Sequence, residues 1–195
     1  MDKAAKRLAV IYVILLSLCA PLMAVHFELF TWFMGVVDMS YWTQTVLWFL
    51  PMLVYGGILV ILGIWNMVKS FQIYKRQDML GCINGMLIHK YGLVIFFCVN
   101  FIVLFLVYFM LTFGLVMGTR GLALLVAPVW LPFVLVMIGW SVIMSWLAIL
   151  PGSMYSIQVI RGSVRAGKIS GGAAVLHGIL QFLFLADVLD AMYLA

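Results

Sequence analysis

Three polar side chains near the end of the sequence have the types and spacing that acid–base or ion-coupling chemistry requires. His177, Asp187 and Asp190 lie in or directly after residues 169–186, a stretch without Lys, Arg, Asp or Glu. The two aspartates are three residues apart and share one helix face, where they could hold a proton or a cation. His177 is ten residues from Asp187, about 15 Å of helix, so one continuous helix cannot pair them as base and orienting acid. This spacing argues against hydrolysis.

A second set of polar side chains is expected near the middle of the membrane. His177 and Gln181 are one helical turn apart, and Asn100 has a comparable depth in an earlier apolar segment. We expect the three to meet as interhelical hydrogen bonds or, in a transport protein, as the lining of a polar pathway. In the second case Asp187 and Asp190 would lie at its outer mouth.

Other motifs do not support catalysis. Residues 162–168 have the spacing of a phosphate-binding loop, but Ile169 follows the lysine where Ser or Thr should hold magnesium. Two pairs of potential metal ligands have no third ligand at usable spacing (His89 with Cys82, and His26 with Glu28). We therefore expect no cofactor, no metal site and no enzymatic activity.

The elements that carry these residues follow from composition. Of 195 residues 67% are hydrophobic and only 9% are charged, so lipid rather than water must surround most of the chain. Stretches without charge are each long enough for a helix to cross a hydrocarbon core of ~30 Å. They predict five transmembrane helices, at residues 8–27, 44–68, 91–117, 123–150 and 171–192.

A short amphipathic helix is expected on the membrane surface between the last two spans. Pro151 and Gly152 should end the fourth span, and in residues 153–166 apolar and polar side chains occupy neighbouring arcs of a helical wheel. The predicted fold is an all-α polytopic integral membrane helix bundle that forms a single transmembrane domain over residues 1–195.

The basic residues predict the orientation of the bundle. Because they are scattered between apolar runs, the net charge of +5 does not indicate a nucleic-acid partner. Cytoplasmic loops of membrane proteins are enriched in Lys and Arg, which predicts a cytoplasmic N-terminus and, with five crossings, an external C-terminus. Candidate contacts for a cytosolic partner or for lipid headgroups are Lys75, Arg76, Arg161, Arg165 and Lys168.

Two C-terminal segments carry a family resemblance. Residues 151–161, and residues 176–182 followed by 187–194, resemble small uncharacterised polytopic membrane proteins of Gram-positive, clostridial-type bacteria. The resemblance covers about the last quarter of the chain. It implies a multi-pass protein of a bacterial plasma membrane, and it assigns no activity and no residue role.

The sequence favours a non-enzymatic integral membrane subunit or accessory of a larger assembly, most of all a transporter energised by a separate chain. Its partners would be the lipid bilayer and other membrane or cytosolic subunits, or further copies of the chain. The alternative is a self-sufficient, oligomeric carrier or channel for a small solute, lipid or cation. An intramembrane enzyme acting on lipids has the least support, because no two acid–base candidates face each other at one depth.

Overall fold

The structure, a computed structural model, describes residues 3–183 and 186–195. These residues form helices joined by short connections, so the all-α prediction is confirmed. The elements are α1 Lys3–Val36, α2 Tyr41–Lys75, α3 Met79–Gly118, the 3-10 helix η1 Leu122–Val126, α4 Ala127–Arg165, α5 Gly171–Leu180 and α6 Ala186–Leu194.

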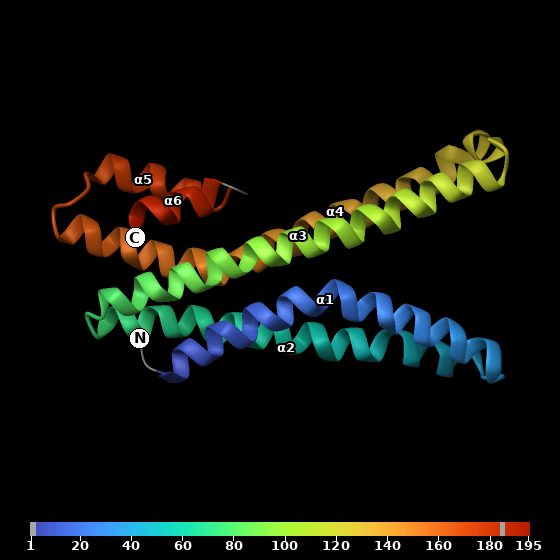
Figure 1. Cartoon of the computed structure of the whole chain (residues 1–195), viewed down its shortest axis with the longest axis horizontal. Coiled ribbons are helices and arrows are strands. Elements are labelled where there is room, and N and C mark those ends of the chain that lie inside the picture. The colour runs from blue at the N-terminus through green and yellow to red at the C-terminus, as the bar shows by residue number, and fades with distance from the viewer. Residues whose placement is uncertain (1–2, 184–185) are drawn as a thin grey trace.

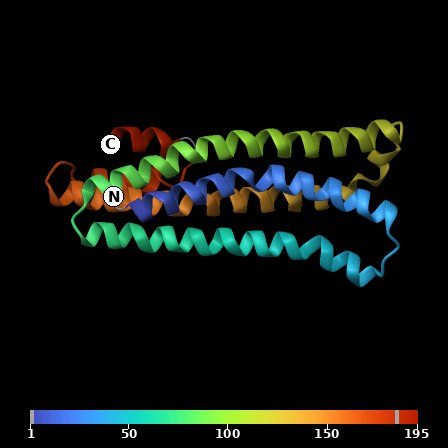
Figure 2. The ribbon, with the colours of Figure 1, turned by 60° about the horizontal axis from the view of Figure 1, so that its bottom comes forward.

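The four long helices form two antiparallel hairpins, α1 with α2 and α3 with α4 (Figure 1). α1 packs against α2 and α3, and α4 also packs against α2 and α3, so the bundle is two helices wide and two deep. The helices run side by side along the bundle (Figure 2). The short helices α5 and α6 form a third hairpin that packs on α3 and α4 near both chain termini.

Polar side chains cap the first turns of three helices. Ser40, Asp78 and Ser170 precede α2, α3 and α5, and each side-chain oxygen accepts a hydrogen bond from the N–H three residues later. The bond from Gly81 N–H to the Asp78 carboxylate is 2.8 Å long, and it is the main reason that the pKa of Asp78 lies below its ordinary value. Asp78 therefore caps α3.

The C-terminal end of α4 closes in a Schellman motif. Gly167 has a left-handed φ of +69°, and the N–H of Lys168 donates to the carbonyl of Ser163 at 2.9 Å. Gln77 takes the same left-handed position after α2, with a φ of +59°. A side chain at this position is strained, because the left-handed region favours glycine.

Among the side chains that the structure describes, the packed core fills the half of the bundle that contains the termini. The described buried residues of α1 end at Ala20, those of α2 begin at Gly63, and those of α3 end at Phe96. Among the described side chains in the far half, Val134 of α4 is the single buried apolar residue. The two long hairpins diverge in that half (Figure 1).

Glycines allow the helices of the packed half to approach closely. A Cβ atom at Gly92 of α3 would collide with the side chain of Val13 on α1, and one at Gly85 would collide with the ring of Tyr155. In contrast, a Cβ atom at Gly114, in the far half of α3, would meet nothing within 4 Å. These glycines thus mark close helix packing at the end of the bundle that carries the termini.

The predicted surface helix over residues 153–166 is wrong. Residues 127–165 form the single helix α4, with Pro151 inside it. Gly152 allows close packing here, since a Cβ atom at this position would lie 3.0 Å from that of His89. Contacts with α3 therefore continue through the expected break, and the proline does not end the helix.

The predicted fifth span is also wrong. Residues 171–192 contain α5, of 10 residues, and the first part of α6, which has 9, and neither is long enough to cross a bilayer. Residues 184 and 185 of the expected span lie outside the described residues. The chain reverses between the two helices, so both termini lie at the same end of the molecule (Figures 1 and 2), contrary to the predicted topology.

Candidate functional site

A buried ion pair joins α3 to the C-terminal hairpin. The Nζ atom of Lys90 lies 2.7 Å from Oδ2 of Asp187, and the two side chains are 1% and 3% exposed. Lys90 lies about three helical turns into α3, while Asp187 lies in the first turn of α6. An ion pair this deep depends on further hydrogen bonds, because both charges have lost their water.

The end of α5 supplies those further bonds. The carbonyl oxygen of Gln181 accepts a hydrogen bond of 2.7 Å from the Ser153 hydroxyl and a longer one of 3.5 Å from Lys90 Nζ. Lys90 Nζ also lies 3.4 Å from the Ser153 hydroxyl. These contacts satisfy a carbonyl that the end of a helix leaves without an internal partner.

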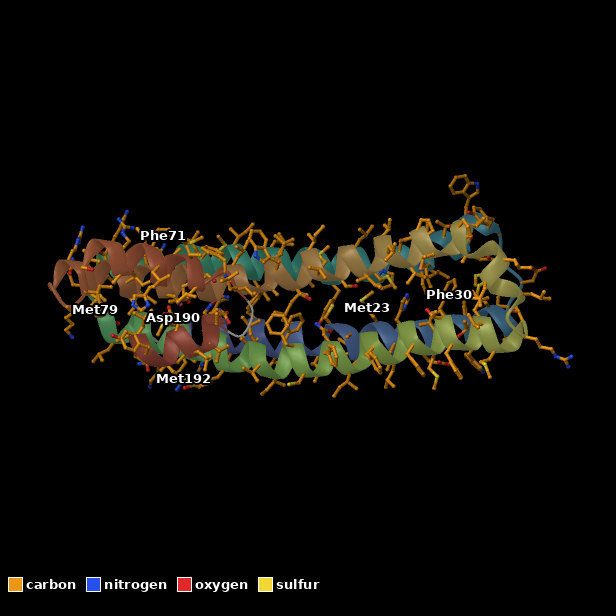
Figure 3. All side chains as sticks on the ribbon, turned by 90° about the horizontal axis from the view of Figure 1, so that it is seen from above. Met23, Phe30, Phe71, Met79, Asp190 and Met192 are labelled. Atoms are coloured by element: carbon orange, nitrogen blue, oxygen red, sulfur yellow. The ribbon has the colours of Figure 1, made fainter. Side chains whose placement is uncertain are left out.

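The second aspartate holds α5 against α6. Oδ1 of Asp190 lies 2.5 Å from Nδ1 of His177, and Oδ2 accepts a hydrogen bond from the side-chain amide of Gln181. The ring of Tyr193 stacks on that of His177 with centroids 5.4 Å apart. Figure 3 shows Asp190 on the inner side of this hairpin. The expected His177–Gln181 pair thus meets through a shared carboxylate.

His89 lies beside Lys90 and extends the polar cluster into the bundle. Its Nδ1 lies 2.8 Å from the carbonyl of Gly85, which can only accept, so Nδ1 carries the proton. Its ring stacks on that of Tyr155 at 5.2 Å between centroids. Several buried polar atoms have no hydrogen-bond partner among the described residues: Asn66 Oδ1, Tyr74 OH, His89 Nε2, Tyr155 OH, Gln158 Nε2 and Gln181 Oε1.

The five basic candidates are exposed and lie at the same end of the bundle as the termini. Two of them share a contact, because the guanidinium carbons of Arg161 and Arg165 each lie 5.4 Å from the centre of the Tyr74 ring. Lys75 and Arg76 follow Tyr74 at the end of α2, and Lys168 follows α4.

The structure brings most of the polar candidates together, but in an unexpected way. Asp187 and Asp190 were expected at an outer mouth, but they contact residues at the end of the bundle that carries both termini. Asn100 is ten residues, about 15 Å of helix, beyond Lys90 on α3, so it does not join the contacts described here among Lys90, His177, Asp187 and Asp190. One continuous helix was expected to keep His177 apart from Asp187, and in the structure His177 pairs with Asp190 instead, because the chain reverses between α5 and α6.

Sequence reasoning missed Lys90 and Ser153. Lys90 lies between the second and third predicted spans, whereas in the structure residues 79–90 are part of α3. The Asp78 cap carries the available signal, because a helix that begins there and runs on without a break places Lys90 about 16 Å along its axis. A lysine that is buried so far inside a helical bundle needs a partner such as a carboxylate.

The family comparison covers the whole of this arrangement. A model described as a family of unknown function, DUF6652, matches residues 3–195. The chain belongs to this family. Every helix of the ionic cluster lies inside the DUF6652 match, which extends far beyond the C-terminal quarter that carried the earlier resemblance. No curated protein and no solved structure matches the chain.

The chemistry available to this DUF6652 protein follows from the contacts. An Asp190–His177 pair can hold a proton, and the buried Lys90–Asp187 pair can anchor a segment. Within the described residues, the hydrogen bonds of His177 include no hydroxyl or thiol that it could activate as a nucleophile. The described residues also contain no group of three or more potential metal ligands. The cluster is best suited to holding helices together or to moving a proton.

Proposed function

We propose that this DUF6652 protein is a non-enzymatic integral membrane subunit of a larger assembly in a bacterial plasma membrane, such as a transporter energised by a separate chain. Among the described residues, four helices are long and apolar enough to cross a bilayer. We propose that the chain crosses the membrane four times and that the end with the α5–α6 hairpin faces the cytosol. The far half of the bundle would receive a helix of a partner subunit.

Matching depths on α1 and α2 support the four crossings. On α1 the charge-free residues 8–27 lie between Arg7 and Glu28, about 30 Å at 1.5 Å per residue. On α2, Trp48 and Lys69 are about 32 Å apart by the same measure. The two outer boundaries coincide, since His26 Nε2 lies 3.2 Å from the carbonyl of Trp48. Both lengths fit a hydrocarbon core of ~30 Å.

Charge supports a cytosolic location for the end that carries the termini. Of the eleven basic residues, all except Arg120 belong to that end of the bundle. The excess of Lys and Arg marks the cytosolic side of a membrane protein. An even number of crossings then puts both termini inside, in place of the external C-terminus expected for five crossings.

The C-terminal hairpin fits a re-entrant segment under this proposal. With 10 and 9 residues, α5 and α6 enter the inner leaflet and return. Backbone groups in such a turn need protein partners, because hydrocarbon offers none. The Gln181 carbonyl has them in Ser153 and Lys90.

The far half of the bundle is the observation that carries the subunit hypothesis. Exposed apolar side chains on outward faces need only lipid, but here an inward face is exposed as well. Met23 of α1 is 46% exposed although it lies between the α1–α3 layer and the α2–α4 layer (Figure 3). Helices in a membrane associate through close packing, so an unfilled inner face favours a further helix from a partner.

Site-specific photo-crosslinking in native membranes tests this proposal. A crosslinker at Met23 should join the chain to one membrane polypeptide, which should then co-purify in a fixed ratio. The matched control is Met86, which is fully buried in the packed half and should give only intramolecular products.

The outcomes of this test are distinct. A single partner at Met23 that is absent at Met86 supports the hypothesis. An adduct of the chain with itself supports a homo-oligomer instead, and lipid adducts alone, together with purification as a monomer, contradict a subunit role.

The ionic cluster favours one alternative, a self-sufficient carrier or channel. Buried ionisable groups at membrane depth often couple ion movement to transport, and His177, Gln181, Asp187 and Asp190 would do so here, with Asn100 further along the pathway. In proteoliposomes containing a pH-sensitive dye, a potassium diffusion potential should then drive proton entry. Entry that is unchanged in the D187N/D190N variant would reject this role of the aspartates.

A further inference from the structure

We propose that the groove between α4 and α5 binds an anionic phospholipid, with its phosphate between Arg161 and Arg165 and an acyl chain along the apolar floor. The groove has a volume of about 430 Å³. The proposal rests on the membrane placement proposed above but is independent of any partner subunit.

The floor of the groove suits a hydrocarbon chain. Apart from the two arginines, its lining consists of small or apolar residues from both helices: Ile157, Ile160, Val164, Ala174, Val175 and Gly178. Gly178 has no side chain and Ala174 has a small one, so the groove stays open along α5. A water-soluble anion would gain no binding free energy from this floor, because apolar surface is buried favourably only against other apolar groups.

The two arginines are positioned by the same aromatic ring. Each guanidinium carbon lies 5.4 Å from the Tyr74 ring centre, a distance typical of a cation–π contact. Tyr74 is only 8% exposed and belongs to the packed core, so it is a fixed support for both. Arginine is well suited to a phosphate, since its planar group donates two parallel hydrogen bonds.

Among the residues that the structure describes, no ion pair balances the charge at this place. Neither arginine forms an ion pair with any described residue, and Lys75, Arg76 and Lys168 add further positive charge at the same end. The nearby carboxylates are already engaged, Asp187 by Lys90 and Asp190 by His177, while Asp78 caps α3. An external anion is therefore the complementary ligand.

The depth of the groove matches that of a phosphate layer. Tyr74 lies five residues beyond Lys69, about 7 Å past the proposed hydrocarbon boundary at 1.5 Å per residue. On α5, Leu176 and Ile179 are 58% and 57% exposed, as expected for a helix with one face in lipid. The occupant is thus a lipid rather than a free phosphate.

Lipid retention measured by native mass spectrometry tests the proposal. The purified full chain is delipidated and incubated with phosphatidylglycerol or with phosphatidylcholine of identical acyl chains, in separate arms with or without excess glycerol 3-phosphate and inorganic phosphate. The variants are R161Q/R165Q, which removes the phosphate contacts, and A174F/G178L, which fills the floor. The matched control K3Q/K69Q removes two positive charges from the same end outside the groove.

The wild-type chain and the control should retain phosphatidylglycerol over phosphatidylcholine by about 30-fold, the attraction expected from two basic side chains. R161Q/R165Q should lose this preference, R161K/R165K should restore part of it, and A174F/G178L should release the lipid. Circular dichroism and elution volume must match the wild type for each variant.

Three results would overturn the proposal. They are equal retention by R161Q/R165Q and the wild type, an equal loss in K3Q/K69Q, and displacement of the lipid by inorganic phosphate, which would indicate a free-phosphate site. Failure of the subunit hypothesis would not change these readings, because the measurement uses the isolated chain. Failure of the chain to float with liposomes would reject the membrane placement itself.

Discussion

At the scale of single residues, Lys90 has the largest effect on how the chain is arranged. Its ammonium group meets Asp187, Ser153 and the carbonyl of Gln181, so one side chain binds α4 and the C-terminal hairpin to α3. Buried ion pairs of this kind are weak evidence for net stability, but the loss of one partner is costly. The pair therefore specifies where the hairpin docks.

A double-mutant cycle on this pair tests that role. K90M alone and D187L alone should each reduce the free energy of unfolding by about 3–5 kcal/mol, because each leaves a buried charge without its partner. The double variant K90M/D187L should recover most of that loss. Unfolding of the purified protein by SDS titration in mixed micelles gives the values, and losses that simply add would contradict a coupled pair.

Asp190 should affect the stability of the α5–α6 hairpin without affecting that of the four long helices. D190N leaves the shape intact but offers one acceptor oxygen to two donors, His177 and Gln181, at a cost of about 1–3 kcal/mol. Hydrogen–deuterium exchange should therefore rise in α5 and α6, while exchange in the packed half of α3 stays unchanged. An equal rise throughout α3 would show that the hairpin and the bundle unfold together.

At the scale of helices, neighbouring residues determine where a helix begins and ends, whereas residues far away in sequence determine what it packs against. The cap at Asp78 can be read from the sequence, since a short polar side chain before an apolar run favours a helix start, whereas the cap at Ser170 was not predicted. Pro151 was misread because a proline breaks an isolated helix, whereas in α4 the packing of Gly152 on His89 continues past it. The reversal after Gln181 was also unpredictable, because its partners, Ser153 and Lys90, lie far away in sequence.

The left-handed positions after α2 and α4 give a matched pair of substitutions. Q77G should raise the free energy of unfolding by up to about 1 kcal/mol, since glycine adopts a φ of +59° without strain. G167A should lower it by a similar amount, because a Cβ atom there meets nothing within 4 Å and acts only through the backbone. Thermal unfolding in detergent measures both, and equal signs would contradict this explanation.

At the scale of the molecule, the bundle is closed at one end and open at the other. Composition predicted the four long helices, because an apolar run of this length is stable in lipid when it forms a helix. The division into two halves was not predictable, since residues such as Met23 and Met86 have the same type but very different burial. Met86 is buried because it packs in a core cluster with residues far away in sequence, such as Tyr155 and Val159.

Two alanine substitutions on α3 test this division. G92A should destabilise the protein by about 1–3 kcal/mol, because its methyl group overlaps Val13 and forces α1 away. G114A should be neutral or stabilising by up to about 1 kcal/mol, since alanine favours a helix and nothing lies near it in the isolated chain. SDS titration compares the two. A large loss for G114A in the purified chain would show that the far half is packed after all.

The long separation between Lys90 and Asp187, 97 positions in sequence, has a consequence for synthesis. The lysine leaves the ribosome long before the aspartate that neutralises it has been translated. During that interval the lysine has no Asp187 to pair with. Under the membrane placement proposed above, we expect α3 to reach its final depth only after α6 has been synthesised.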